Sequence, residues 1–167
     1  MKEFEELYML YQKDIYYFLL KLTGHETSLA EELTQESFYQ AFISFKNFRG
    51  ECAIKSWLCQ IAKNTYYRYL RELTKQTNIK SKVNLDADVK PVSAVVEEKQ
   101  LVAHIRKVIE GLDEKNRSIV EYRLFCQLPY KEIGYLLGIR EATVKVLFSR
   151  AKVKIQTKLK EEYGYEI

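Results

Sequence analysis

The segment "KEIGYLLGIREATVKVLFSRAK", residues 131–152, places two glycines four residues apart inside a pattern otherwise typical of α-helix. Two helices that cross at a steep angle approach closely only where the first carries a small residue. The turn between them also needs a residue that adopts a left-handed backbone conformation. Gly134 and Gly138 meet these two needs in order, and Val144 can fill the gap from the second helix. The segment therefore predicts a helix-turn-helix.

The second helix of this motif, expected over residues 141–154, carries polar and basic residues away from its apolar positions. Their side chains are donors suited to phosphate oxygens and to guanine edges. An ordinary helical hairpin uses similar glycines without binding DNA, and this remains the alternative. The outward donors favour a helix that lies in the major groove of DNA. They are Arg140, Thr143, Lys145, Ser149, Arg150 and Lys152.

The remainder of the chain is also helical in its periodicity. Apolar residues recur at three- and four-residue steps, no segment alternates as a strand would, and six glycines and two prolines in 167 residues favour long helices. Gly24 is expected to end the first helix, and Thr27 or Ser28 to cap the second, with Glu31 completing an S-x-x-E capping pattern. The predicted helices are residues 4–22, 28–45, 54–73, 95–110, 113–126, 130–137 and 141–160.

The helices fall into two groups separated by a polar segment. Residues 74–94 are rich in lysine, contain Pro91 and show no apolar periodicity, so they read as a flexible linker. We therefore predict an all-α fold of two small helical domains, residues 1–73 and 95–167, joined by this linker. The helix-turn-helix lies in the second domain.

Charge is distributed unevenly, although the net charge is only +4. Residues 26–45 contain four glutamates and no Lys or Arg. Residues 46–82 carry a net charge of +7 and residues 140–158 a net charge of +5. Two basic blocks and one acidic block suggest a long polyanion held at two places and a separate basic partner.

Several classes of function are disfavoured by what the sequence lacks. There is no apolar run long enough for a membrane span and no signal-peptide pattern, so we expect a cytoplasmic protein without membrane insertion. Cys52, Cys59 and Cys126 lack C-x-x-C spacing, which predicts plain buried thiols and neither a disulfide framework nor a metal site. No nucleophile–base pair or phosphate-cradling glycine loop is present. The chain is therefore not expected to be an enzyme or to need a cofactor.

Three ordered segments are similar to the bacterial sigma factors of RNA polymerase, and specifically to the extracytoplasmic-function group of the sigma-70 family. "AEELTQESF" (30–38) resembles the family's polymerase-binding signature, and "FRGECAIKSWLCQIAKNTYYRYLRE" (48–72) its promoter-melting and −10-reading segment. "LPYKEIGYLLGIREATVKVLFSRAKVKI" (128–155) resembles its −35-reading helix-turn-helix. The last motif alone occurs in other transcription regulators, but the ordered set is specific and spans nearly the whole chain.

The resemblance implies three binding surfaces and no covalent chemistry. Core RNA polymerase would be bound by Glu31, Glu32, Gln35 and Glu36. The −10 element of promoter DNA would be contacted by Phe48, Arg49, Lys63, Asn64, Tyr67, Arg68 and Arg71. The −35 element would be contacted by Arg140, Thr143, Lys145, Val146, Ser149 and Arg150.

Aromatic residues in the −10 segment support a role in DNA opening, because a captured base recovers stacking energy, about 1–3 kcal/mol each. Trp57 is expected in the core. Tyr66, Tyr67 and Tyr69 span three sides of one helix, so at least one should be exposed. The resemblance also predicts an anti-sigma factor as a partner. The alternative function is a stand-alone helix-turn-helix regulator with an N-terminal sensing or dimerisation domain.

Overall fold

The computed structural model describes the backbone of residues 2–77 and 94–166 and the side chains of 2–77 and 97–166. Within these residues every regular element is helical and no strand is present, so the predicted all-α fold is confirmed. The elements are α1 Lys2–Leu22, α2 Thr27–Ser44, the 3₁₀ turn η1 Phe45–Asn47, α3 Ile54–Thr77, α4 Ala94–Glu110, α5 Glu114–Val120, the π-helical turn η2 Glu121–Phe125, α6 Tyr130–Leu137 and α7 Glu141–Tyr163.

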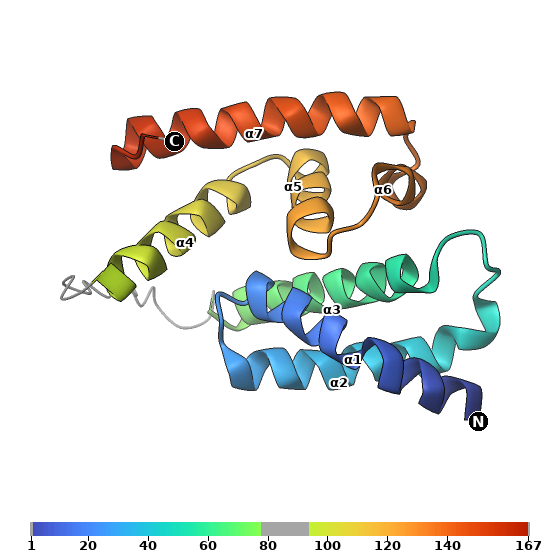
Figure 1. The fold of residues 1–167 in the computed structure, drawn as a ribbon. Helices are drawn as coiled ribbons and strands as arrows, with labels where there is room; N and C mark the ends of the chain where they lie inside the picture. The colour runs from blue at the N-terminus through green and yellow to red at the C-terminus, as the bar shows by residue number, and fades with distance from the viewer. Residues whose placement is uncertain (1, 78–93, 167) are drawn as a thin grey trace.

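The first three helices form a bundle, here called the N-terminal unit (Figure 1). Helices α1, α2 and α3 each pack against the other two. Apolar residues at helical spacing meet between them, as the periodicity predicts, and each Leu, Ile or Phe side chain among them adds about 1.5–3 kcal/mol of hydrophobic stabilisation when fully buried. The buried set includes Ile15, Phe18, Leu19, Leu33, Phe38, Leu58 and Ala62.

The elements from α4 to α7 form the C-terminal unit, in which α7 runs above α4, α5 and α6 in Figure 1. One stripe of α7 is buried against these shorter elements, and its members are Val144, Phe148, Ala151, Ile155 and Leu159. The stripe follows three- and four-residue steps, so it covers only one side of the helix. The opposite side of α7 is left to solvent.

The glycine pattern of the helix-turn-helix is confirmed. Gly138 ends α6 in the left-handed conformation, with φ +68°. A Cβ at Gly134 would lie 2.7 Å from the backbone oxygen of Ile139, so the turn passes directly against α6 at this point. Val144 is fully buried on α7. The three residues therefore have the roles that their spacing predicts.

The helix ends carry residues that commonly stop or cap helices, except at α2. Gly24 and Gly164 stand at helix ends with φ +69° and +74°, and Asp113 caps α5 by accepting from the Asn116 N–H at 3.3 Å. The predicted cap of α2 is wrong, because the N-cap residue is Glu26 and its side chain makes no capping hydrogen bond. The helix begins at Thr27, which places Ser28 inside the first turn, where its hydroxyl cannot serve as the cap.

Residues at both edges of the predicted linker, 74–77 and 94, are helical. Helix α3 continues to Thr77, and the hydroxyls of Thr74 and Thr77 donate to carbonyl groups of the preceding turn. Helix α4 already includes Ala94. The polar residues at the end of α3 are exposed and still helical, because no glycine or proline interrupts the helix before residue 78. Residues 78–93 of the predicted linker lie outside the described residues, and the domain limits 1–73 and 95–167 stay a prediction.

The prediction of plain buried thiols is wrong for two of the three cysteines. Cys59 and Cys126 are both buried but form a disulfide, with their Cα atoms 6.9 Å apart. The two residues are 67 positions apart in sequence, and only the packing of the C-terminal unit on α3 brings them together. Cys52 is a free, half-buried thiol. None of the described helices is long and apolar enough to cross a bilayer.

Candidate nucleic-acid interface

The recognition face of α7 consists of the six residues predicted to contact the −35 element. The buried stripe of α7 turns all six toward solvent, and even the apolar Val146 is 49% exposed. An exposed β-branched residue among basic side chains is suited to contact with a thymine methyl group. The exposed residues are Arg140, Thr143, Lys145, Val146, Ser149 and Arg150.

The N-terminal end of α7 adds a backbone contribution to this face. Arg140 is the N-cap residue and makes no capping hydrogen bond with its side chain. The first N–H groups of a helix attract anions when side chains do not cap them. The Lys145 Nζ lies 3.7 Å from Glu141 Oε1, but the two side chains are 58% and 50% exposed. This ion pair therefore holds Lys145 only weakly.

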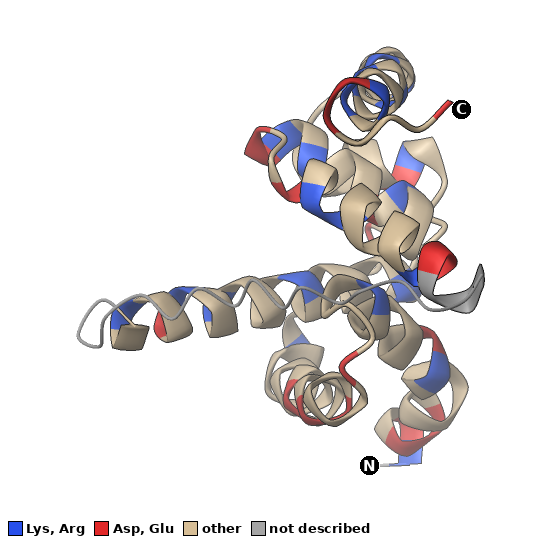
Figure 2. Cartoon of the chain, turned by 90° about the vertical axis from the view of Figure 1, so that its left-hand side faces the viewer, with Lys and Arg blue, Asp and Glu red and all other residues tan. Residues whose placement is uncertain are grey.

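Helix α3 carries a second basic row. Asn64, Arg68 and Arg71 are exposed and follow the four- and three-residue steps that place residues on one side of a helix. Figure 2 shows Lys and Arg recurring along α3, the long helix that leads into the grey trace. Arg68 lies 3.7 Å from Glu36 of α2, and both are partly exposed. This row is open to a polyanion.

The other −10 residues of α3 face the C-terminal unit. Lys63 and Tyr67 are half-buried, one turn apart, and the Lys63 Nζ lies 5.3 Å from the centre of the Tyr122 ring. The Tyr67 hydroxyl donates to Glu121 Oε1 of η2. Burial is the main reason that the pKa of Lys63 is lowered and that of Tyr67 is raised. The seven predicted −10 residues are therefore divided between an open row and a covered row.

The loop between α2 and α3 is also tied to the C-terminal unit. The Ala53 N–H donates to Glu132 Oε2 at 3.1 Å, and the Tyr135 hydroxyl donates to Glu51 Oε2 at 2.6 Å. Glu132 and Tyr135 both lie on α6. Arg49, in the same loop, is exposed. Much of the predicted −10 surface thus lies beside the helix-turn-helix.

The aromatic residues of the −10 segment depart from expectation. Trp57 is half-buried and not in the core, because it packs under the loop, with its ring 5.0 Å from that of Phe48. Tyr66 is buried, whereas Tyr67 and Tyr69 are half-buried, so the exposed tyrosine that was predicted is absent from this trio. The C-terminal unit covers Tyr67, which the helical pattern of α3 alone places at the surface.

The acidic face predicted for polymerase binding lies on α2. Glu31, Glu32 and Gln35 are exposed, and Glu36 is half-buried and accepts from Gln40 Nε2 at 2.9 Å. Buried Ala30, Leu33, Thr34, Ser37 and Phe38 occupy the opposite side. The helix therefore presents its acidic residues outward as one face, on the part of the N-terminal unit away from α7 (Figure 1).

Sequence reasoning missed one ionisable residue between the two units. Glu121 is 2% exposed, its Oε1 accepts from Tyr67, and its Oε2 has no hydrogen-bond partner. The Arg117 Nε is 3.9 Å from Oε1. Burial raises the pKa of the Glu121 carboxyl to about 7. The sequence feature that could have indicated this burial is the position of Glu121, which directly follows the apolar pair Ile119 and Val120.

This pKa shift predicts a stability that falls as pH rises. The folded chain holds a proton on Glu121 between pH 4.5, the ordinary value, and about 7, whereas the unfolded chain has released it. The contribution is therefore fully present below pH 4.5 and is lost as pH rises through 7. Tyr67 and Lys63 face the carboxyl from α3, Arg117 from α5 and Glu110 from α4.

We expect Glu121→Gln to remove this dependence. At pH 8 the variant should be more stable than the parent by up to roughly 3 kcal/mol, and the difference should vanish near pH 4.5. Urea unfolding at a series of pH values measures it. Glu114→Gln, at an exposed position of α5, is the control and should keep the parent's pH dependence. Parallel curves for Glu121→Gln and the parent would contradict the prediction.

The fold and these surfaces define a class, the helix-turn-helix DNA-binding proteins with a second basic helix. Comparison with known proteins identifies a family within this class. Residues 7–76 match the family described as Sigma-70 region 2, and residues 104–155 match Sigma-70, region 4. The two matches cover most of the chain in the order that the sequence motifs predict.

Curated relatives and solved structures agree with this match. The chain is 27% identical to the ECF RNA polymerase sigma factor SigM of Bacillus subtilis, covering 91% of this chain and 92% of SigM. It is 28% identical to the RNA polymerase sigma factor YlaC of the same species, over 95% of this chain and 94% of YlaC. The fold matches sigma factor RpoE, solved with anti-sigma factor NepR from Bartonella quintana, with a TM-score of 0.65 and 20% identity over 97% and 99% of the two chains.

The chain belongs to the sigma-70 family, in its extracytoplasmic-function group of RNA polymerase sigma factors. The predicted resemblance is confirmed, and with it the main functional prediction, a factor for transcription initiation. The stand-alone regulator is not favoured, because the N-terminal unit matches sigma region 2.

Proposed function

We propose that this sigma factor directs core RNA polymerase to promoters through three helices, each of which binds a different partner or promoter element. The recognition face of α7 reads the −35 element, α3 and the loop before it bind and open the −10 element, and the acidic face of α2 binds the core enzyme. The protein acts in the cytoplasm and performs no covalent chemistry. The observation that carries the proposal is that all six −35 residues are exposed, on the side of α7 away from its buried stripe.

Run-off transcription with purified core polymerase, this protein and a pool of genomic promoters tests the proposal. Defined transcripts should appear only when both proteins are present, and their start sites should share two upstream elements. Binding of the free protein to duplex DNA is expected to be weak. Specific protection of a duplex by the protein alone, without initiation on core polymerase, would instead support the stand-alone regulator.

The acidic face of α2 gives a direct prediction for assembly with core polymerase. We expect Glu32→Lys to weaken core binding by about tenfold or more, because a reversed charge at the centre of a complementary interface costs on the order of 2 kcal/mol. Gel filtration or fluorescence titration with core enzyme measures the loss. Glu161→Lys, exposed near the end of α7, makes the same charge change elsewhere and should leave core binding intact. Equal losses in both variants would show a general charge effect and contradict the assignment.

The proposal includes control by an anti-sigma factor. It is supported by the fold match to RpoE in complex with NepR and by a second match, CnrH in complex with the cytosolic domain of CnrY, with a TM-score of 0.64. Co-purification of this chain from unstressed cells should yield a stoichiometric partner that blocks run-off transcription. Isolation of the free chain or of holoenzyme alone, under every growth condition, would contradict this part.

A further inference from the structure

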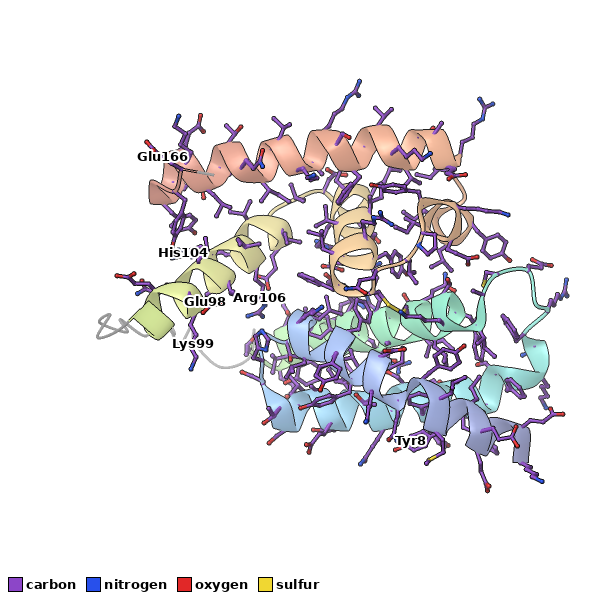
Figure 3. The ribbon with its side chains drawn as sticks, in the orientation of Figure 1. Tyr8, Glu98, Lys99, His104, Arg106 and Glu166 are labelled. Atoms are coloured by element: carbon purple, nitrogen blue, oxygen red, sulfur yellow. A yellow bond between two sulfur atoms is a disulfide. The ribbon has the colours of Figure 1, made fainter. Side chains whose placement is uncertain are left out.

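The disulfide between Cys59 and Cys126 joins the two units of the protein. Cys59 lies on α3 of the N-terminal unit, and Cys126 directly follows η2 of the C-terminal unit. Both residues are buried, at 0% and 3% exposure. A covalent bond at this place holds η2 on α3, and the disulfide can be followed in Figure 3 as the yellow bond between the two units. Its effect on function depends on what else η2 covers.

The disulfide lies in the covered row of α3. Cys59, Lys63 and Tyr67 follow one another at four-residue steps, so they share one side of the helix. From η2, Glu121 accepts a hydrogen bond from Tyr67 and Tyr122 lies beside Lys63. The bond therefore fixes η2 on the two predicted −10 residues that the C-terminal unit already covers.

Other contacts show that the two units meet along the length of α3. Near one end, Arg106 of α4 points toward the N-terminal unit and lies against Gly24, after α1 (Figure 3). Near the other, Tyr135 of α6 donates to Glu51. The disulfide lies between these contacts, where separating the units requires it to be broken. We call this arrangement the closed form.

The closed form is too compact to reach both promoter elements. Elements near −10 and −35 are separated by about 25 base pairs, which is roughly 85 Å of B-form DNA at 3.4 Å per base pair. A compact chain of this length has a radius of gyration of about 15 Å. Reading both elements therefore requires α7 to move away from α3. A bond between Cys59 and Cys126 prevents that movement.

We propose that Cys59 and Cys126 are a redox-reactive thiol pair whose oxidation locks this sigma factor in the closed form and prevents promoter recognition. The inference rests on the proposed function of α3 and α7 and adds to it a means of regulation. Reduction releases the C-terminal unit and exposes Lys63 and Tyr67. Disulfides inside cells are commonly transient and redox-sensing, which fits a bond placed across a functional interface.

The chemistry needs a hydroperoxide as oxidant and a dithiol as reductant. One thiolate attacks the peroxide oxygen, the O–O bond breaks, and a sulfenic acid and water or an alcohol form. The second thiolate attacks the sulfenic sulfur, the S–S bond forms and water leaves, so two thiols lose two electrons in total. A dithiol returns the electrons by thiol–disulfide exchange. Both cysteines are buried in the closed form. The hydroperoxide therefore reaches the reduced thiols when the units separate, and the dithiol reaches the bond through local opening around η2.

The test uses the full-length protein in run-off transcription with core polymerase, after reduction by dithiothreitol or oxidation by hydrogen peroxide. Mass spectrometry of the alkylated protein should find three reactive thiols after reduction and one, Cys52, after oxidation. We expect oxidation to lower transcription by about tenfold or more, since a locked closed form leaves little competent protein, and dithiothreitol to restore it. Cys52→Ser keeps both members of the pair and is the matched control, and oxidation and reduction should change its transcription by the same factor as that of the parent.

The variants Cys59→Ser and Cys126→Ser should transcribe equally well in both redox states. The redox cycle of the parent tests the lock without any substitution, which covers the case of a variant that fails to fold. Full activity of a parent chain shown by mass to contain the Cys59–Cys126 bond would overturn the inference, as would oxidation that joins two chains through Cys52. Absence of transcription by the reduced parent would instead overturn the proposed function, so the two failures are distinguishable.

Discussion

Replacement of Gly134 by valine is expected to disrupt the helix-turn-helix and abolish transcription that depends on the −35 element. The new Cβ would lie 2.7 Å from the Ile139 carbonyl oxygen and 3.4 Å from the Glu141 backbone nitrogen. These are backbone atoms of the turn into α7, so neither can move aside without shifting the recognition face. We expect a loss of about 3 kcal/mol or more in the free energy of unfolding. Urea unfolding followed by circular dichroism measures it.

Two other glycines provide controls for this prediction. At Gly111 an added Cβ meets nothing closer than 3.5 Å, so Gly111→Ala should change stability by less than about 0.5 kcal/mol. At Gly138 there is open space but a φ of +68°, and Gly138→Ala should cost about 1 kcal/mol through backbone strain alone. If all three substitutions lower the free energy of unfolding by the same amount, the close approach of the turn to Gly134 is not the reason that this position requires glycine.

Local signals predicted the parts of this fold that depend on neighbouring residues. The positions of Gly134, Gly138 and Val144 fixed the helix-turn-helix because close approach, a left-handed turn and a filled gap each require one kind of residue. The recognition face followed from the same helix, since burying every third or fourth residue of α7 determines which side remains for DNA. For the same reason the buried stripe of α2 leaves Glu31, Glu32 and Gln35 exposed.

The parts that sequence reasoning missed all depend on how the two units dock. Cys59 and Cys126 become partners only when η2 lies on α3, and no spacing rule connects residues 67 positions apart. Tyr67 is at a surface position of α3 and is covered by the C-terminal unit. The same docking of the two units removes Glu121 from water. Helical periodicity describes each helix against its own bundle and carries no information on contacts between bundles.

The double variant Lys145→Glu, Arg150→Glu is expected to eliminate most −35-dependent transcription while leaving the fold intact. Each side chain is exposed on the recognition face, and losing one base or phosphate contact costs about 1–3 kcal/mol, so the two reversals together should lower promoter binding by about 100-fold or more. Lys145 gives up its exposed ion pair with Glu141 and a contact of its Nζ with the Tyr130 ring, 6.0 Å from the ring centre, so stability should change by less than about 1 kcal/mol. Run-off transcription and thermal unfolding measure the two effects.

The control separates a loss of recognition from a loss of positive charge. Lys160→Glu reverses a charge on the same helix, at an exposed position beyond the recognition face, and should leave transcription within about twofold of the parent because a lone surface charge at a distance is screened by salt. The double variant should also lose its distinction between a promoter with the −35 element and one with that element scrambled. If it still prefers the intact element, the recognition face is not the −35 reader and the turn preceding α7 must be considered instead. If Lys160→Glu fails equally, α7 contributes general attraction to DNA and the choice of promoter lies elsewhere in the chain.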